Sequence, residues 1–210
     1  MPHIVGELIF DSSVVLAIVF GNRRHESRLA KMQVDIEKYQ IKHSITPQVS
    51  LECTARVKEI SEFLSETVRA LFDDMRKKKG ATLQTAGNLN MGEDDYAYIM
   101  NFFSKLISRL PRDLGTEKEK LEILETFVVR YLEDQLRNNK SLSIDSFFSD
   151  CIIELGRMMT NMSSSLGRYV SNCTQANVIE KDTIVLEKLF GIKWGDAKII
   201  LETAQHMKTG

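Results

Sequence analysis

The chain has 210 residues, enough for one large domain, or for one domain with a sizeable insertion, around a hydrophobic core. With 28 Lys and Arg against 29 Asp and Glu, the net charge is −1, which excludes a polycation that holds nucleic acid through its overall charge. Any contact with nucleic acid must therefore come from a local patch.

The N-terminal stretch is largely apolar, but acids interrupt it. Residues 4–20 contain Glu7 and Asp11, and no Lys or Arg precedes them. A secretory signal needs a basic start, and a membrane-spanning helix needs about 20 mostly apolar residues. We therefore expect a soluble, cytoplasmic protein without a membrane partner.

The first predicted elements are a strand and a helix. Residues 4–10 favour a buried strand because they are rich in β-branched and aromatic side chains. Residues 12–20 are apolar without strict alternation, and they can form a helix. Asp11 would then stand at the carboxyl end of the strand, the edge where open α/β sheets bind ligands. We expect its carboxylate to be buried, and a buried carboxylate needs a partner or a metal.

The next elements are predicted from local start signals. Residues 22–39 are charged and favour a helix, and residues 43–45 favour a short second strand. Thr46 followed by Pro47 is a strong helix start, with Thr as the N-cap and Pro at the first helical position. Apolar residues at three-to-four spacing carry this helix as far as Met75.

A basic run at residues 76–79 and Gly80 end that long helix. Cations complement the dipole at a helix C-terminus, and Gly stops a helix. We interpret the run as a solvated helix end, and a contact with RNA phosphates is the alternative. Residues 81–93 are small and polar and predict a linker.

The rest of the chain is predicted to be helical. Apolar stripes typical of a helical core mark three amphipathic helices, at 99–110, 121–132 and 148–162. Two shorter helices follow, at 182–190 and 195–207, and Gly191 between them is typical of the residue just beyond a helix end.

Three acids stand out by position, although none is diagnostic alone. Asp11 ends the first strand, Glu52 lies in the first turns of the long helix, and Asp196 lies at the start of the last helix. Taken singly, Glu52 can be a surface residue, and Asp196 can be a charge or cap at a helix start.

Together, the segments around these acids resemble the PIN-domain nucleases. In that family an Asp ends the first strand and precedes a small hydroxyl residue, as in Asp11-Ser12-Ser13. A Glu opens a later helix, as Glu52 does after Thr46-Pro47. A further Asp precedes Ala at the start of a helix, as in Asp196-Ala197.

The resemblance implies an α/β fold: a PIN-like core with a small parallel sheet, predominantly helical overall because of a helical insertion. It covers roughly residues 4–60 and 180–208, and an insertion explains the long separation of the last two acids. The implied domains are residues 1–80 and 176–210 for the two parts of the core, and residues 81–175 for the helical insertion.

The family's final strand and last acid have no counterpart before Gly210. One side of the central strand would then be unpaired, which is a liability for a sheet. If the chain is not truncated, we expect the insertion or a second chain to cover that edge.

The function implied by the resemblance is that of a ribonuclease that hydrolyses RNA phosphodiester bonds. Asp11, Glu52 and Asp196 would be catalytic and would bind Mg²⁺ or Mn²⁺, with Ser12 or Ser13 orienting a carboxylate or a water. Hard divalent cations prefer oxygen ligands. A bound metal can activate water and offset charge on a transferring phosphoryl group.

Two alternatives stay open. Without the last acid, the core can be a catalytically degenerate interaction protein whose helical insertion offers an apolar groove to a protein partner; a homodimer is also possible. The chain can also be entirely helical, with no sheet. The short motifs of zinc enzymes, nucleotide-binding loops and serine hydrolases do not occur in the sequence.

Overall fold

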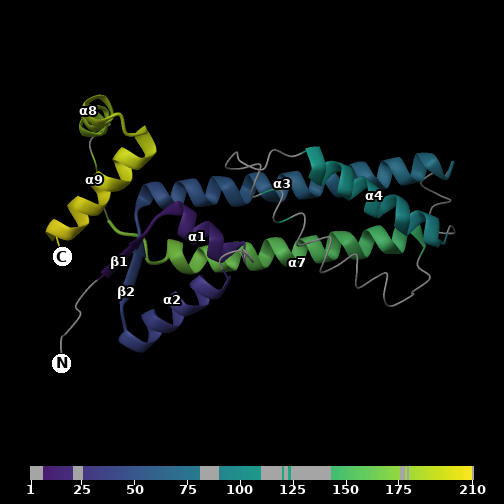
Figure 1. The fold of residues 1–210 in the computed structure, drawn as a ribbon, viewed down its shortest axis with the longest axis horizontal. Coiled ribbons are helices and arrows are strands. Elements are labelled where there is room, and N and C mark those ends of the chain that lie inside the picture. The colour runs from purple at the N-terminus through teal and green to yellow at the C-terminus, as the bar shows by residue number, and fades with distance from the viewer. Residues whose placement is uncertain are drawn as a thin grey trace. The chain divides into compact units, whose positions relative to one another are not determined.

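The computed structural model describes residues 7–20, 26–80, 90–109, 120, 123, 143–175, 178 and 180–209. Within these ranges the protein is a mixed α/β structure that is mostly helical and has a small parallel sheet (Figure 1). The predicted dominance of helices over a small parallel sheet is therefore confirmed. The entirely helical alternative is wrong, because two strands pair side by side.

The sheet is formed by β1 (Glu7–Phe10) and β2 (Lys42–Ile45), which run parallel with Phe10 opposite Ile45. A further segment lies on the other side of β2, where the Thr174 N–H donates to the Ile45 carbonyl oxygen at 2.8 Å. Cys173 forms a parallel bridge with Ile45 at the same place. This pairing was not predicted from the sequence.

The helices that follow the strands begin where the sequence signals place them. α1 (Ser12–Val19) starts directly after Asp11, and α3 (Pro47–Lys78) starts with Pro47 at its first position. The hydroxyl of Thr46 accepts from the Val49 N–H at 3.4 Å, as expected of an N-cap. Because the strands are parallel, α1 and α3 begin at the same edge of the sheet.

The two faces of the sheet differ in character. On one face the rings of Phe10 and His43 stack, and α2 (Glu26–Tyr39) lies near them, lining a cavity together with these rings. On the other face Ser44 donates to Glu7. Successive side chains of a strand point to opposite faces of the sheet, so His43 and Ser44 lie on different faces.

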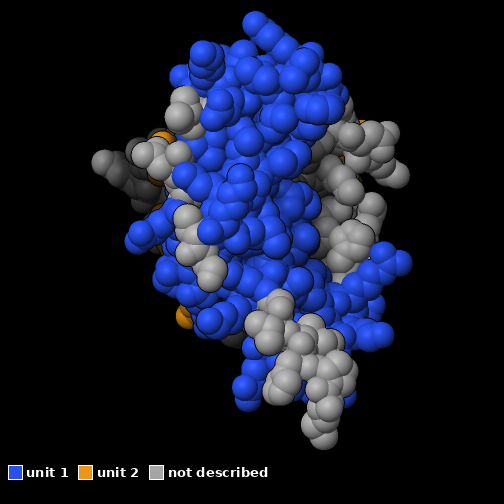
Figure 2. Space-filling model, turned by 90° about the vertical axis from the view of Figure 1, so that its left-hand side faces the viewer, with its two compact units in different colours: residues 1–57, 161–210 blue, residues 58–160 orange. Residues whose placement is uncertain are grey.

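The chain divides into two compact units, coloured separately in Figure 2. The first unit consists of residues 1–57 and 161–210, and the second of residues 58–160. The domains expected from the resemblance also place a central segment between two flanking ones. The bounds of that central segment differ, however, because the compact units change within α3 and within α7 (Ile144–Val170).

The second unit holds the later part of α3, together with α4 (Glu93–Arg109) and the first part of α7 (Ile144–Val170). Its core is aromatic and aliphatic, with Phe147 edge-on to Tyr96 at 5.8 Å between ring centroids. The predicted helix at 121–132 lies outside the described residues except for Ile123, which is buried. Residues 81–89 of the predicted linker also lie outside them.

The tail forms α8 (Glu180–Phe190) and α9 (Trp194–Thr209), close to the predicted bounds. Gly191 has a φ of +65°, a left-handed conformation that suits a glycine just past a helix end. Gly80, just past the end of α3, also has a left-handed conformation, with a φ of +61°. None of the helices in the described ranges combines the length and the apolarity that crossing a bilayer requires.

Candidate acidic site at the strand ends

Asp11 lies between β1 and α1 and caps its own helix. Its backbone is extended, and its Oδ1 accepts from the Ser12 N–H at 2.7 Å while its Oδ2 accepts from the Ser13 hydroxyl at 2.8 Å. The side chain is exposed, so the expected burial of this acid is wrong. The apolar runs on either side belong to two elements that meet at a corner, and the corner itself faces solvent.

The start of α1 contacts the second turn of α3. The Cys53 thiol, which is fully buried, donates to the Ser12 carbonyl oxygen at 3.9 Å. Glu52 immediately precedes Cys53 in α3. The second candidate acid therefore lies one residue from a contact with the first turn of α1.

Glu52 in turn lies against the start of α9. Its Oε1 accepts from the Gln48 side-chain amide at 2.9 Å. The same oxygen is 2.8 Å from the point that a Cβ at Gly195 would occupy. A glycine at this position lets the carboxylate approach the α9 backbone closely.

Asp196 follows Gly195 in the first turn of α9, and its side chain is exposed. The neighbouring Trp194 is partly exposed, and Lys198 holds its ammonium 5.0 Å from the centre of the Trp194 ring. The Lys198 ammonium thus makes a cation–π contact with the partly exposed indole.

The three predicted acids thus lie in the capping position or first two turns of α1, α3 and α9, the helices labelled in Figure 1. Contacts link α1 to α3 and α3 to α9. Among the residues that the structure describes, however, no three or more His, Cys, Asp or Glu side chains are gathered so that they could hold a metal ion. Asp11, Glu52 and Asp196 therefore stay predicted ligands.

Glu202 is an acid that the sequence reasoning did not single out. It is 1% exposed and accepts from the Gln48 backbone N–H at 2.9 Å, which caps the start of α3 from α9. No sequence signal marks this burial, because residues five positions apart on a helix, such as Ala197 and Glu202, lie about 140° apart around its axis.

Glu7 is a second acid with structural partners. It accepts from Ser44 at 2.7 Å and pairs with His206 of α9 at 2.9 Å. The hydrogen bonds from His206 and Ser44 hold the pKa of the Glu7 carboxyl below its usual value. In the sequence, Glu7 interrupts an apolar stretch, and this is the same feature that made Asp11 a candidate.

Cys173 is near this network but is not an activated nucleophile. Burial, and then the negative charge of Glu202, raise the pKa of the Cys173 thiol. The thiolate is the nucleophilic form of cysteine, so a raised pKa argues against covalent chemistry there.

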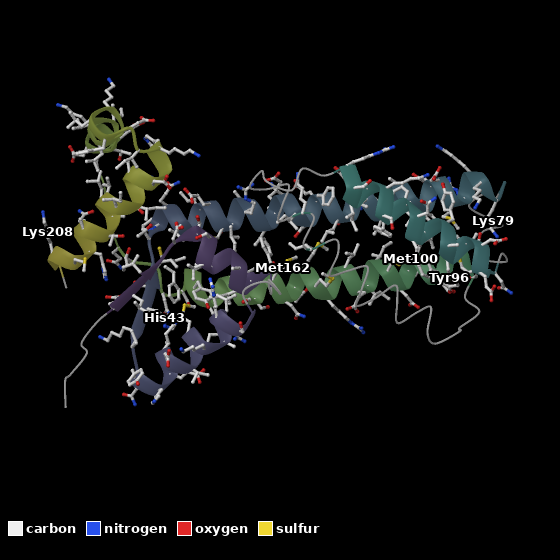
Figure 3. The ribbon with its side chains drawn as sticks, in the orientation of Figure 1. His43, Lys79, Tyr96, Met100, Met162 and Lys208 are labelled. Carbon is white, nitrogen blue, oxygen red and sulfur yellow. The ribbon has the colours of Figure 1, made fainter. Side chains whose placement is uncertain are left out.

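The basic run that ends α3 is largely engaged within the second unit. Lys79, which is labelled in Figure 3, pairs with the buried Asp95 at 2.6 Å, and Lys78 lies 4.0 Å from the centre of the Tyr98 ring. Arg76 pairs with Asp73 at 3.8 Å. These contacts favour the interpretation of the run as a helix end over that of an RNA contact.

No protein-family model, no curated protein and no solved structure matches this chain.

Proposed function

We propose that the protein is a PIN-like ribonuclease that depends on Mg²⁺ or Mn²⁺ and hydrolyses RNA phosphodiester bonds at the edge where β1 and β2 end. The observation that carries this proposal is the linked arrangement of three helix starts, each with one of the acids Asp11, Glu52 and Asp196. These segments are far apart in the chain, and the contacts between their helices agree with a common site.

The donor chemistry fits a hard divalent cation, since carboxylate oxygens are the ligands that such cations prefer. Carboxylates that share a site without a cation repel one another. The Gln48 side-chain amide donates to Glu52 Oε1, and a bound cation would compete with it for that oxygen.

The residues of the chain have separate tasks in this proposal. Ser13 and the Ser12 N–H hold the Asp11 carboxylate in one orientation. The starts of α1, α3 and α9 carry partial positive charge, which favours an anionic phosphate nearby. When bound, the cation would supply a water of lowered pKa and offset the charge of the reacting phosphate.

A degenerate, non-catalytic PIN-like protein whose helical insertion binds a protein partner is the second candidate. It is favoured by the lack of a gathered set of metal-binding side chains among the described residues. Activity distinguishes the two candidates directly, because a degenerate core cleaves no RNA.

The test is cleavage of a mixed set of fluorescent single-stranded RNAs in the presence of Mn²⁺. We expect cleavage by the wild type and a loss of about 100-fold or more in Asp11→Asn, on the scale of an essential acid–base or metal-binding group. Asp182→Asn is the matched control, since Asp182 is an exposed acid in the first turn of α8. Absence of cleavage by the wild type, or equal cleavage by Asp11→Asn, would contradict the proposal.

A further inference from the structure

A cavity of about 380 Å³ lies in the first unit between α2 and the face of the sheet that carries Phe10 and His43. Met32 and Ile36 of α2 line it on one side, and Tyr169 of α7 lines it on another. Pockets for small ligands run from about 300 to 1,000 Å³, so this cavity has room for a molecule of one or two rings.

The helix that covers the cavity is not closely packed. None of the α2 side chains that the structure describes is fully buried, and Met32 and Ile36 are half-buried at the cavity wall. Protein cores are normally packed as densely as organic crystals. Open space beneath an amphipathic helix is therefore the kind of gap that a small ligand fills.

Three aromatic rings form part of the wall. Phe10 and His43 are stacked at 5.6 Å between centroids, and Tyr169 lies 6.0 Å from each of them (His43 is labelled in Figure 3). Burial raises the pKa of the Tyr169 hydroxyl, so this group stays protonated and can donate a hydrogen bond at neutral pH. Aromatic walls favour flat, unsaturated ligands through stacked or edge-on contacts.

Polar side chains with unused hydrogen-bonding capacity complete the lining. The side chains of Gln33 and Glu37 of α2 and of Arg168 of α7 make no hydrogen bond or ion pair with the described residues, although the Arg168 carbonyl accepts from the Ser171 hydroxyl. They can supply amide, carboxylate and guanidinium groups to the edge of a ligand. A few polar groups around an apolar pocket are typical of sites that orient a small molecule.

We infer that this cavity binds a small planar heteroaromatic molecule of nucleobase or nucleoside size. Its ring system would lie against Phe10, His43 and Tyr169, and its polar edge would face Gln33 and Arg168. None of the acids proposed for RNA cleavage lines the cavity, so this site is independent of the proposed nuclease function.

The test uses adenosine, guanosine, cytidine and uridine as probes, with ribose as the control that lacks a base. Saturation-transfer NMR on the full chain is expected to show contact with the base protons of at least one nucleoside and none with ribose. Calorimetry then gives the affinity for that nucleoside. Absence of transfer to all four nucleosides, or equal transfer to ribose, would overturn the inference.

Variants locate the binding. Ile36→Trp fills the cavity and is expected to lower the affinity by 10-fold or more, whereas Ile36→Val leaves the space and the affinity nearly unchanged. Tyr169→Leu removes a ring and is expected to weaken binding, whereas Tyr169→Phe keeps the ring and most of the affinity. Circular dichroism checks that each variant is folded.

If Ile36→Trp does not fold, Tyr169→Leu and Tyr169→Phe test whether the nucleoside binds in this cavity. Equal affinity in the wild type, Tyr169→Phe and a folded Tyr169→Leu would contradict the inference. Asp11→Asn is expected to bind the nucleoside as the wild type does, which separates this result from the outcome of the cleavage assay.

Discussion

Asp11 and Asp95 are both acids at the start of a helix, but their surroundings are opposite. Asp11 is exposed and accepts from the two serines that follow it. Asp95 is 2% exposed and accepts from the Lys79 ammonium and the Gly92 N–H. The sequence did not show which of the two is buried, because burial depends on distant segments.

Asp95→Asn tests the buried ion pair at the end of α3. The change removes a charge-assisted hydrogen bond to Lys79, and we expect a loss of about 1–3 kcal/mol in the free energy of unfolding. Urea unfolding followed by circular dichroism measures it. Asp94→Asn is the control, because Asp94 is the exposed neighbour in the same helical turn.

The effect of Asp95→Asn is expected to depend on pH. Burial alone would raise the pKa of the Asp95 carboxyl, but the hydrogen bonds from Lys79 and Gly92 outweigh it and hold the pKa below its ordinary value of 3.8. The stabilisation is therefore present above that ordinary value and is lost as the pH falls through the lowered one. A difference between wild type and variant that stayed constant from pH 7 to the acid limit would contradict this assignment.

Gly195→Ala tests the close approach of Glu52 to α9. A Cβ would lie 2.8 Å from Glu52 Oε1, so the flexible carboxylate must move. We expect weaker Mn²⁺ binding but little loss of stability, because Ala favours a helix over Gly by up to about 1 kcal/mol. Calorimetry and thermal unfolding measure the two effects.

Gly167→Ala is the matched control for that change. Gly167 lies inside α7, and a Cβ there would meet no atom within 4 Å. If both glycine variants bind Mn²⁺ equally, the position of Glu52 has no part in metal binding.

At the scale of the elements, local signals predicted starts and ends well. Thr46-Pro47 marked the start of α3, and Gly80 and Gly191 lie just beyond helix ends. The pairing of Ile45 with Cys173 was missed, because Ser171–Thr174 carry no alternation or β-branched run that predicts a strand. Such a short pairing is set by the docking of α7 beside the sheet rather than by local preference.

Glu202 links two elements, and its variants test that link. Removing its carboxylate leaves the Gln48 N–H at the start of α3 without this acceptor. We expect Glu202→Ala to lower the free energy of unfolding by about 1–3 kcal/mol. Glu202→Gln keeps an oxygen acceptor and is expected to cost less. Equal losses in both variants, measured by urea unfolding, would count against a capping role.

At the scale of the whole molecule, the candidate site is built from segments that the sequence could align only by resemblance. The hydrogen bond between Gln48 and Glu202 joins residues 154 positions apart. The resemblance predicted that the acids at residues 11, 52 and 196 belong to one region, and contacts link the helices that carry them. It could not predict how each carboxylate is hydrogen-bonded, because that depends on how α9 docks against α3.

Titration of the protein with Mn²⁺ in a calorimeter tests most directly whether these acids form a divalent-cation site. We predict saturable binding by the wild type, a loss of 10-fold or more in affinity in Asp11→Asn, and no change in Asp182→Asn. A wild type that takes up no Mn²⁺, or an Asp11→Asn variant that binds it as tightly as the wild type, would contradict the account.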